Sequence, residues 1–263
     1  MNMPTQFRHL DDHLPKSGSL MIAGSYGSGK TEVAVNLALT LAALGRKVRL
    51  IDLDIVNPYF RCREARKLLE NNGIRVVVPQ GELLNADLPV ILPEIATLFH
   101  GGEEVVNLFD VGGDDLGARV LSSFAPLIKR GPYHLWQVIN TRRPFTSSVA
   151  GCLAMQKAIE TASRLQITGL LTNTHLIYET TPDTIIEGLQ LTRDLIRANG
   201  LPIILVAAMA EFAAQLEPVL EPVLWLRRAM LPPWMMIGSS SDESEPHRKS
   251  GPIGVPGPIG PAL

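Results

Sequence analysis

The chain of 263 residues has little of what marks several specialised classes of protein. It has only two cysteines, Cys62 and Cys152, which are far apart and do not form a C-x-x-C pair. Neither a disulfide framework nor a zinc site is indicated, because both need more cysteines or closer spacing. We expect two reduced thiols, as in a cytoplasmic protein.

An excess of charge of one sign is also missing. The net charge is −2 and the isoelectric point is about 6.3, so the composition offers no overall basic surface for nucleic acid. Residues 1–18 mix charge with proline and lack the apolar core of a signal peptide. The longest apolar run, 201–210, contains Pro202 and is shorter than the roughly 20 residues that span a bilayer. We therefore predict a cytoplasmic protein, with neither nucleic acid nor a membrane indicated as partner.

The most informative stretch is residues 20–31, where a short apolar run leads into Gly24-x-x-x-x-Gly29-Lys30-Thr31. This is the phosphate-binding loop pattern, in which backbone N–H groups surround the β- and γ-phosphates and glycines keep side chains away. Lys30 is predicted to contact the phosphate oxygens, and the Thr31 hydroxyl is predicted to bind Mg²⁺. The predicted phosphate site comprises Gly24, Ser25, Gly27, Ser28, Gly29, Lys30 and Thr31.

The sequence around this loop has the required context. A buried-strand run at 19–23 precedes it, and an amphipathic helix at 30–44 follows and stops before Gly45. Without these neighbours an ordinary glycine-rich turn would be the simpler interpretation. Further strands are expected at 47–53, 74–78, 104–109, 133–140, 167–172 and 202–207, with helical segments between them.

This alternation predicts an α/β fold: a doubly wound, mainly parallel sheet of about seven strands with helices on both faces. Ligands of such sheets bind at the carboxyl ends of the strands. We expect an N-terminal extension at 1–18, a nucleotide-binding domain at 19–237 and a disordered glycine- and proline-rich tail at 238–263. The tail has glycine at every third position from Gly251 to Gly260, but four triplets are too few for a collagen triple helix. Residues 222–236 are expected to form a last strand and a sheet-capping segment, because their prolines disfavour a continuous membrane-binding helix.

Carboxylates follow two of the expected strands. Asp110 precedes Gly112 and Gly113, the arrangement of a Walker-B aspartate near Mg²⁺ followed by glycines that can sense a γ-phosphate. Capping of the next helix is the alternative role for Asp110. Asp52 and Asp54 end an earlier strand and, being two residues apart, point to the same face. Beside a Mg²⁺–phosphate site they could hold metal-bound water or orient the attacking water.

Other polar residues at strand ends have two interpretations. The amide of Asn173 could read a purine edge, although asparagine also favours turns. The chain has no N-K-x-D run for guanine, so adenine is expected. Arg61, Arg142 and Arg143 could each meet a phosphate or an acidic partner, whereas a solvated surface is the ordinary expectation for arginine.

The segments GSYGSGKT, NLALTLAALGRKVRLIDLDIVNP, FDVGGDD and TNTH resemble the MinD/ParA-like group of P-loop ATPases, whose wider set includes the CobQ/CobB-type amidoligases. The resemblance covers residues 19–210 in element order and is most specific over 24–58. It implies catalytic roles for Lys30 on the phosphates and for Asp54 as the carboxylate that orients water. It further implies Thr31, Asp52 and Asp110 around Mg²⁺, Gly113 near the γ-phosphate and Asn173 at the base.

Two residues depart from the pattern of this group. Typical members have a second lysine early in the loop that reaches across a dimer, and Ser25 holds that position here. Glu32 follows Thr31 where a second threonine is usual. In a homodimer that encloses ATP between its subunits, this second lysine contacts the partner's phosphates, and an uncharged serine cannot replace it. ATP binding by one chain does not need that second lysine. The segment after Gly113 also differs from the switch loop of the partition ATPases, so a role in positioning DNA is not carried over.

Three functions follow from these observations. The first is a switch that binds ATP and Mg²⁺, hydrolyses ATP slowly and acts on an unidentified protein partner, with a homodimer as an additional assembly. The second is an ATP-dependent small-molecule ligase or transferase of the CobB or dethiobiotin-synthetase type. The third is a nucleotide-binding module without turnover. The first is favoured, because no substrate-shaping domain is visible beyond residue 210.

Overall fold

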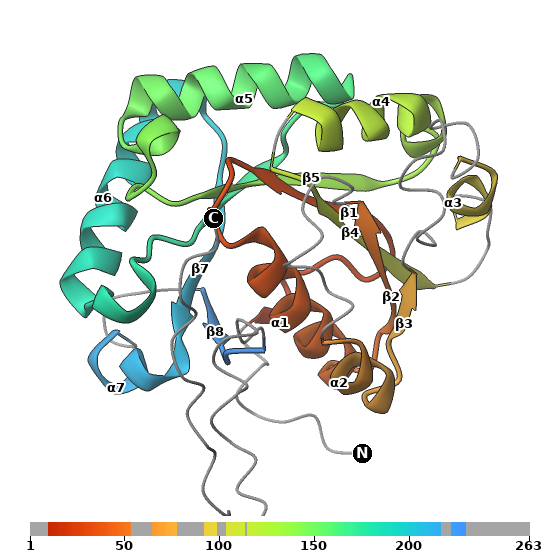
Figure 1. Cartoon of the computed structure of the whole chain (residues 1–263), viewed down its shortest axis with the longest axis horizontal. Helices are drawn as coiled ribbons and strands as arrows, with labels where there is room; N and C mark the ends of the chain where they lie inside the picture. Colours follow the sequence, from red (N-terminus) through yellow and green to blue (C-terminus); the bar gives the residue numbers. More distant parts are fainter. Residues whose placement is uncertain are drawn as a thin grey trace, which may run out of the picture. The chain divides into compact units, whose positions relative to one another are not determined.

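The computed structural model describes residues 10–53, 65–77, 92–98, 104–113, 115–216 and 222–229, all of which belong to one compact unit, Met1–Met230. Within these residues eight strands form a single sheet, in the order β3-β2-β4-β1-β5-β6-β7-β8 (Figure 1). All neighbouring strands are parallel. The predicted doubly wound α/β fold is confirmed. The last strand expected within 222–236 is found at the edge of the sheet, so the described part has eight strands where about seven were predicted.

The strands agree closely with the apolar runs of the sequence. The expected strand at 47–53 is found without change as β2. The bounds are β1 Gly18–Gly24, β2 Lys47–Leu53, β3 Arg75–Val77, β4 Val105–Val111, β5 Tyr133–Ile139, β6 Gly169–Thr172, β7 Ile203–Met209 and β8 Val223–Leu226.

The helices of the described part connect these strands. Their bounds are α1 Lys30–Ala43, α2 Arg66–Asn71, α3 Leu92–Leu98, α4 Asp115–Ile128, α5 Val149–Ser163, α6 Pro182–Asn199 and α7 Ala213–Leu216. Helix α2 lies between β2 and β3, where a helical segment is expected, and residues 61–64 before it lie outside the described part. Helix α6, the longest of the described helices, starts with a hydrogen bond from the Thr184 N–H to the Thr181 hydroxyl and ends at Gly200, which has a φ of 73°. Such caps satisfy backbone groups that a helix end would leave without partners.

The core has two layers because successive residues of a strand point to opposite faces of the sheet. On β1, Leu20 and Ile22 share a hydrophobic cluster with residues of α1 and α2, whereas Met21 and Ala23 share one with residues of α4 and α5. Helices α1 and α2 lie on one face of the sheet, and α4 and α5 lie on the other (Figure 1). All four side chains are at most 2% exposed. A parallel sheet covered on both faces needs apolar residues at every position, which explains the continuous runs in the sequence.

A set of polar contacts ties α1 to the segment that follows β8. The backbone N–H of Ala229 donates to Glu32 Oε1 at 2.6 Å. The side chain of Asn36 bonds both to Arg227 N, at 2.8 Å, and to Arg227 O, at 3.0 Å. Glu32, one of the two departures noted in the sequence, therefore anchors the chain after β8. Among the described helices, none is both long and apolar enough to cross a membrane.

Candidate functional site

The phosphate-loop motif lies between β1 and α1, as its pattern predicts. Gly29, the residue before α1, has a φ of 82°, a left-handed conformation that glycine adopts without strain. A Cβ atom at Gly29 would lie 2.4 Å from Asn173 Nδ2, so there is no room for a side chain. No side chain of the described residues caps the start of α1, so the first backbone N–H groups of this helix have no side-chain cap there. Such groups favour an anionic ligand.

Lys30 is folded back onto the loop. Its side chain is only 7% exposed, and its Nζ donates to Ser25 O at 3.0 Å. Gly113, which follows β4, also lies here: a Cβ atom at Gly113 would be 2.8 Å from Lys30 Nζ and 2.9 Å from Tyr26 Cα. The structure therefore brings together the predicted phosphate-binding lysine and the predicted γ-phosphate sensor.

Asp52 and Asp110 lie side by side at the ends of β2 and β4. They are register partners in the parallel pairing and are 2% and 1% exposed. Because Leu50 and Leu108, two residues earlier in each strand, pack toward α1, both carboxylates point to the face on which α1 begins. Two buried carboxylates so close together are costly unless positive charge compensates them.

The residues at this position suit Mg²⁺. Asp52 and Asp110 are paired at the ends of neighbouring strands, and Thr31 lies in the first turn of α1. Their carboxylate and hydroxyl oxygens are of the ligand type that Mg²⁺ prefers. Among the described residues there is no group of three or more His, Cys, Asp and Glu side chains suited to a metal. Mg²⁺ held with a nucleotide needs only one or two carboxylates, since phosphate oxygens and water complete its shell. Asp54, the predicted water-orienting residue, lies outside the described residues.

On the other flank of the loop, Asn173 and His175 follow β6. Asn173 is 3% exposed and donates from Nδ2 to Ser28 O at 2.8 Å. His175 Nε2 would lie 3.0 Å from a Cβ atom at Gly29 and has no hydrogen-bond partner in the part of the chain that the structure describes. Burial, together with the positive charges of Arg143 and Arg228, lowers the pKa of His175 to about 4. His175 is therefore neutral at pH 7.

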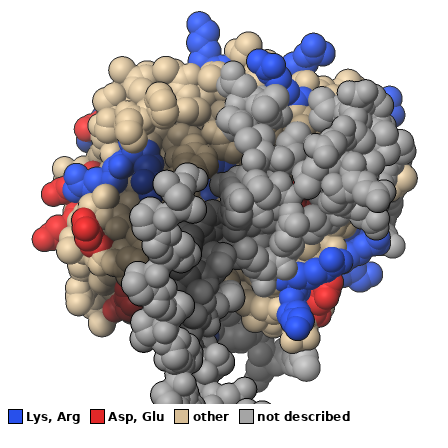
Figure 2. All heavy atoms as spheres, in the orientation of Figure 1, with Lys and Arg blue, Asp and Glu red and all other residues tan. Residues whose placement is uncertain are grey.

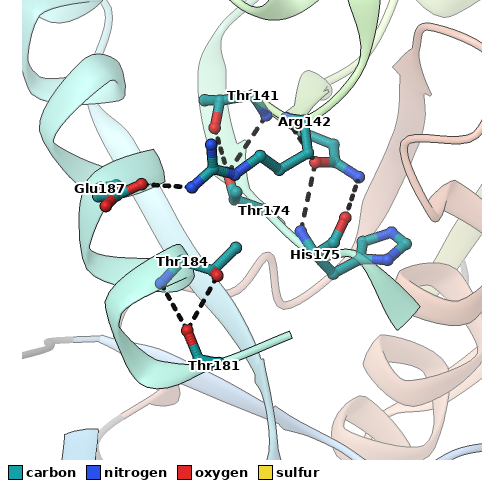
Figure 3. A network of polar contacts seen from close by, with 8 residues as sticks. Thr141, Arg142, Thr174, His175, Thr181, Thr184 and Glu187 are labelled. Carbon is teal, nitrogen blue, oxygen red and sulfur yellow. Dashed lines mark hydrogen bonds and ion pairs between the residues drawn. The ribbon is translucent and has the colours of Figure 1, made fainter. Parts of the chain in front are cut away.

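A network of hydrogen bonds joins the loops after β5 and β6 (Figure 3). The side chain of Asn140 donates to His175 O at 3.1 Å and accepts from His175 N at 3.2 Å. The Thr141 N–H donates to the hydroxyl of Thr174 at 3.3 Å. Arg142 forms an ion pair with Glu187 of α6, which places its guanidinium away from the phosphate loop. The imidazole of His175 points away from these bonds (Figure 3).

Sequence reasoning did not single out Asn140 or His175. Asn140 ends a buried strand as Asn173 does, and that signal could have identified it. His175 has no such local signal, because it reaches the loop after β1 only through the parallel pairings of β1 with β5 and of β5 with β6. Arg61 lies outside the described residues. Lys and Arg side chains are interspersed with Asp and Glu on the visible described face, in agreement with the near-neutral composition (Figure 2).

Comparison with known proteins gives a family match and structural likenesses. A family model described as the CobQ/CobB/MinD/ParA nucleotide binding domain matches residues 20–178. No curated protein matches the chain. The cell division protein FtsY from Thermotoga maritima has a similar structure, with a TM-score of 0.50 and 20% identity over 75% of this chain and 66% of that one. FtsY from Mycoplasma mycoides has a TM-score of 0.47 and 20% identity, over 77% and 63%.

A nucleotide-binding protein from Archaeoglobus fulgidus, solved in complex with ADP, has a TM-score of 0.44 and 16% identity over 77% of this chain and 87% of that one. At such identities the likeness of the Thermotoga structure shows the fold alone. This chain spans 66% and 63% of the two FtsY chains, slightly less than two thirds of their length.

Proposed function

The chain belongs to the CobQ/CobB/MinD/ParA family of nucleotide-binding domains, and we propose that it binds Mg·ATP and acts as a nucleotide-dependent switch on a protein partner, with slow ATP hydrolysis. The observation that carries this proposal is the position of Lys30. Its buried ammonium lies on Ser25 O of the phosphate loop and beside Gly113 at the end of β4. A lysine so placed is aimed at the β- and γ-phosphates of a bound nucleotide.

Each residue of the site has a distinct role in this proposal. The backbone N–H groups of residues 25–29 and the ammonium of Lys30 bind the phosphates. Thr31, Asp52 and Asp110 would hold Mg²⁺. The metal would neutralise negative charge that develops on the β- and γ-phosphates. Asn173 is proposed at the base, where an amide can pair with adenine.

Hydrolysis is proposed to be slow because a charge is missing. Ser25 is 1% exposed, and its hydroxyl has no hydrogen-bond partner among the described residues. It cannot supply the cation that a lysine at this position would deliver. Asp54 is proposed to orient the attacking water. Loss of an arginine-finger type of charge lowers phosphoryl-transfer rates by about 10³ to 10⁵.

The contacts of α4 supply a physical route for the switch. Gly113 approaches Lys30, and Gly112 packs directly on the first turn of α4: a Cβ atom at Gly117 would lie 2.6 Å from Gly112 N. A γ-phosphate that displaces Gly113 would therefore displace the start of α4. We propose α4 as the element whose position reports the nucleotide to a partner.

Two measurements test the proposal. Hydrogen exchange of the full chain with Mg·ATP and with Mg·ADP should show different protection of α4, whereas α5 serves as the internal reference. Equal exchange in both nucleotides would contradict a switch. A pull-down in ATP and in ADP with mass spectrometry should identify a partner retained in only one state. Phosphate release that depends on a small organic acid, and not on a protein, would instead support the ligase.

A further inference from the structure

Arg143 lies directly on the phosphate loop. Its Nε donates to Gly27 O at 2.8 Å. A Cβ atom at Gly27 would lie 3.1 Å from Arg143 Nε and 3.2 Å from its Cζ, so the guanidinium packs against the loop where glycine leaves space. A residue 116 positions away in the sequence thus touches the tip of the loop.

The local sequence fixes the backbone of Arg143. The residue before a proline is disfavoured in the helical region, and Arg143, which precedes Pro144, has an extended backbone with φ −109° and ψ 140°. Its N–H donates to Asn140 O at 3.1 Å, and its carbonyl accepts from Thr146 N at 3.0 Å. The direction of the side chain therefore depends on a tight turn after β5 and not on a long flexible loop.

No carboxylate of the described part neutralises the Arg143 charge. Apart from the bond to Gly27 O, the side chain forms no hydrogen bond or ion pair within the described residues. Its neighbour Arg142 differs, since Arg142 is paired with Glu187. The positive charge of Arg143 also acts on His175, where it contributes to the lowered pKa of the imidazole. A half-buried guanidinium with unused donors next to a phosphate loop indicates an anionic ligand.

We propose that Arg143 contacts the phosphates of the bound nucleotide and strengthens nucleotide binding with a positive charge from the same chain. This inference rests on the proposed function, because it needs a nucleotide in the loop. A planar guanidinium is suited to the task, since its N–H groups can bond two phosphate oxygens together.

A purely structural role is the competing interpretation. Arg143 could support the loop through Gly27 O and never meet the nucleotide. Three variants separate the two roles. Arg143→Gln keeps a donor for Gly27 O and removes the charge, whereas Arg143→Lys keeps the charge and loses the planar group. Arg142→Ala is the matched control, because it removes an adjacent charge that is already paired.

The experiment is a titration of the full chain with labelled Mg·ATP at low and high salt, with the melting temperature of each variant. Arg143→Gln should bind ATP about 10- to 100-fold more weakly than the parent, as expected for a lost bond between charged groups. Its affinity should depend less on salt, and its melting temperature should match the parent's. Arg143→Lys should bind more tightly than Arg143→Gln, and Arg142→Ala should bind like the parent.

Parental affinity in Arg143→Gln would overturn the inference. Equal weakening in Arg143→Gln and Arg143→Lys with unchanged salt dependence would also overturn it, because that pattern reports only support of the loop. Lys30→Ala is included in the same titration. Parental affinity in Lys30→Ala, or no ATP binding by the parent, would refute the proposed function itself, so the two failures are distinguishable.

Discussion

Asn173 and Ser28 are joined by a buried hydrogen bond of 2.8 Å, from Nδ2 to the carbonyl oxygen, although 145 positions separate them in the sequence. The bond comes from the loop after β6 and reaches the last turn of the phosphate loop. Asn173 therefore supports the loop as well as being the proposed base-binding residue. Both roles can be tested with one substitution.

The parent should bind ATP more tightly than GTP, since no guanine-specific run is present in the sequence. Asn173→Ala should lower the affinity for both nucleotides about tenfold, because Ser28 O loses its hydrogen-bond donor. It should also reduce the ratio of ATP affinity to GTP affinity. Competition of labelled ATP with unlabelled ATP and GTP measures this. Asn199→Ala is the control, because it removes an amide at the end of α6 that is hydrogen-bonded to Gln156 of α5 and not to the phosphate loop. Equal displacement by both nucleotides in the parent would remove the base assignment.

Lys30→Ala should lower the affinity for Mg·ATP by about 100-fold or more, because charge-assisted bonds to phosphate are among the strongest in proteins. Calorimetric titration measures the loss. Lys47→Ala removes an exposed lysine at the start of β2 and should leave the affinity unchanged. If both variants bind like the parent, the phosphate loop is not the nucleotide site.

The parent should hydrolyse ATP slowly, and Asp54→Ala should abolish the remaining turnover while ATP binding stays intact. The reason is that Asp54 is assigned to the water and not to the phosphates. Single-turnover assays on the parent, Asp54→Ala and Ser25→Lys measure the rates. Brisk hydrolysis in the parent, or full activity in Asp54→Ala, would contradict these roles.

Glu32→Ala should lower the free energy of unfolding by about 1 to 3 kcal/mol, because the Ala229 N–H loses a partly buried charged acceptor. Glu32→Gln keeps an acceptor oxygen and should lose less. Urea denaturation compares the two, and Glu70→Ala, which removes an exposed i,i+4 ion pair, is the control. An unchanged free energy of unfolding in Glu32→Ala would show that the link to the segment after β8 contributes nothing.

His175 should make the protein less stable in acid. Its pKa is about 4 in the folded chain against 6.5 for the free group, so below pH 6.5 the unfolded chain binds more protons. The stability associated with neutral His175 is therefore complete above pH 6.5 and falls as the pH drops toward 4, by up to about 3 kcal/mol. Unfolding free energies at pH 7 and pH 5 should differ less in His175→Gln than in the parent. An unchanged difference would refute the assignment.

The elements that local signals define were predictable. The bounds of β2 follow from an apolar run with a charged start, and the loop before α1 follows from glycine spacing. Gly45 follows α1, where a helix stop was expected. These features depend on residues close in the sequence, where periodicity and backbone preference act directly.

The contacts that residues after β5 and β6 make with the phosphate loop were not predictable, because they depend on which strands are neighbours in the sheet. Arg142 and Arg143 have the same chemistry and adjacent positions, yet one pairs with α6 and the other lies on the phosphate loop. Only the direction that the turn after β5 gives each side chain separates them. The contact of Glu32 with Ala229 likewise spans 197 positions and leaves no local trace in the sequence.

Because β1 lies inside the sheet, between β4 and β5, its position limits when the protein can fold during translation. β1 and its loop emerge early, but the strands on either side of β1 begin only at Val105 and Tyr133. The hydrogen bond from Asn173 to Ser28 can form only after residue 173 has been synthesised, which is later still. Until those strands are synthesised, the apolar β1 has no sheet partner and is a surface that chaperones would recognise. Nucleotide binding can therefore stabilise the folded chain only late in translation, after the second half of the sheet has been synthesised.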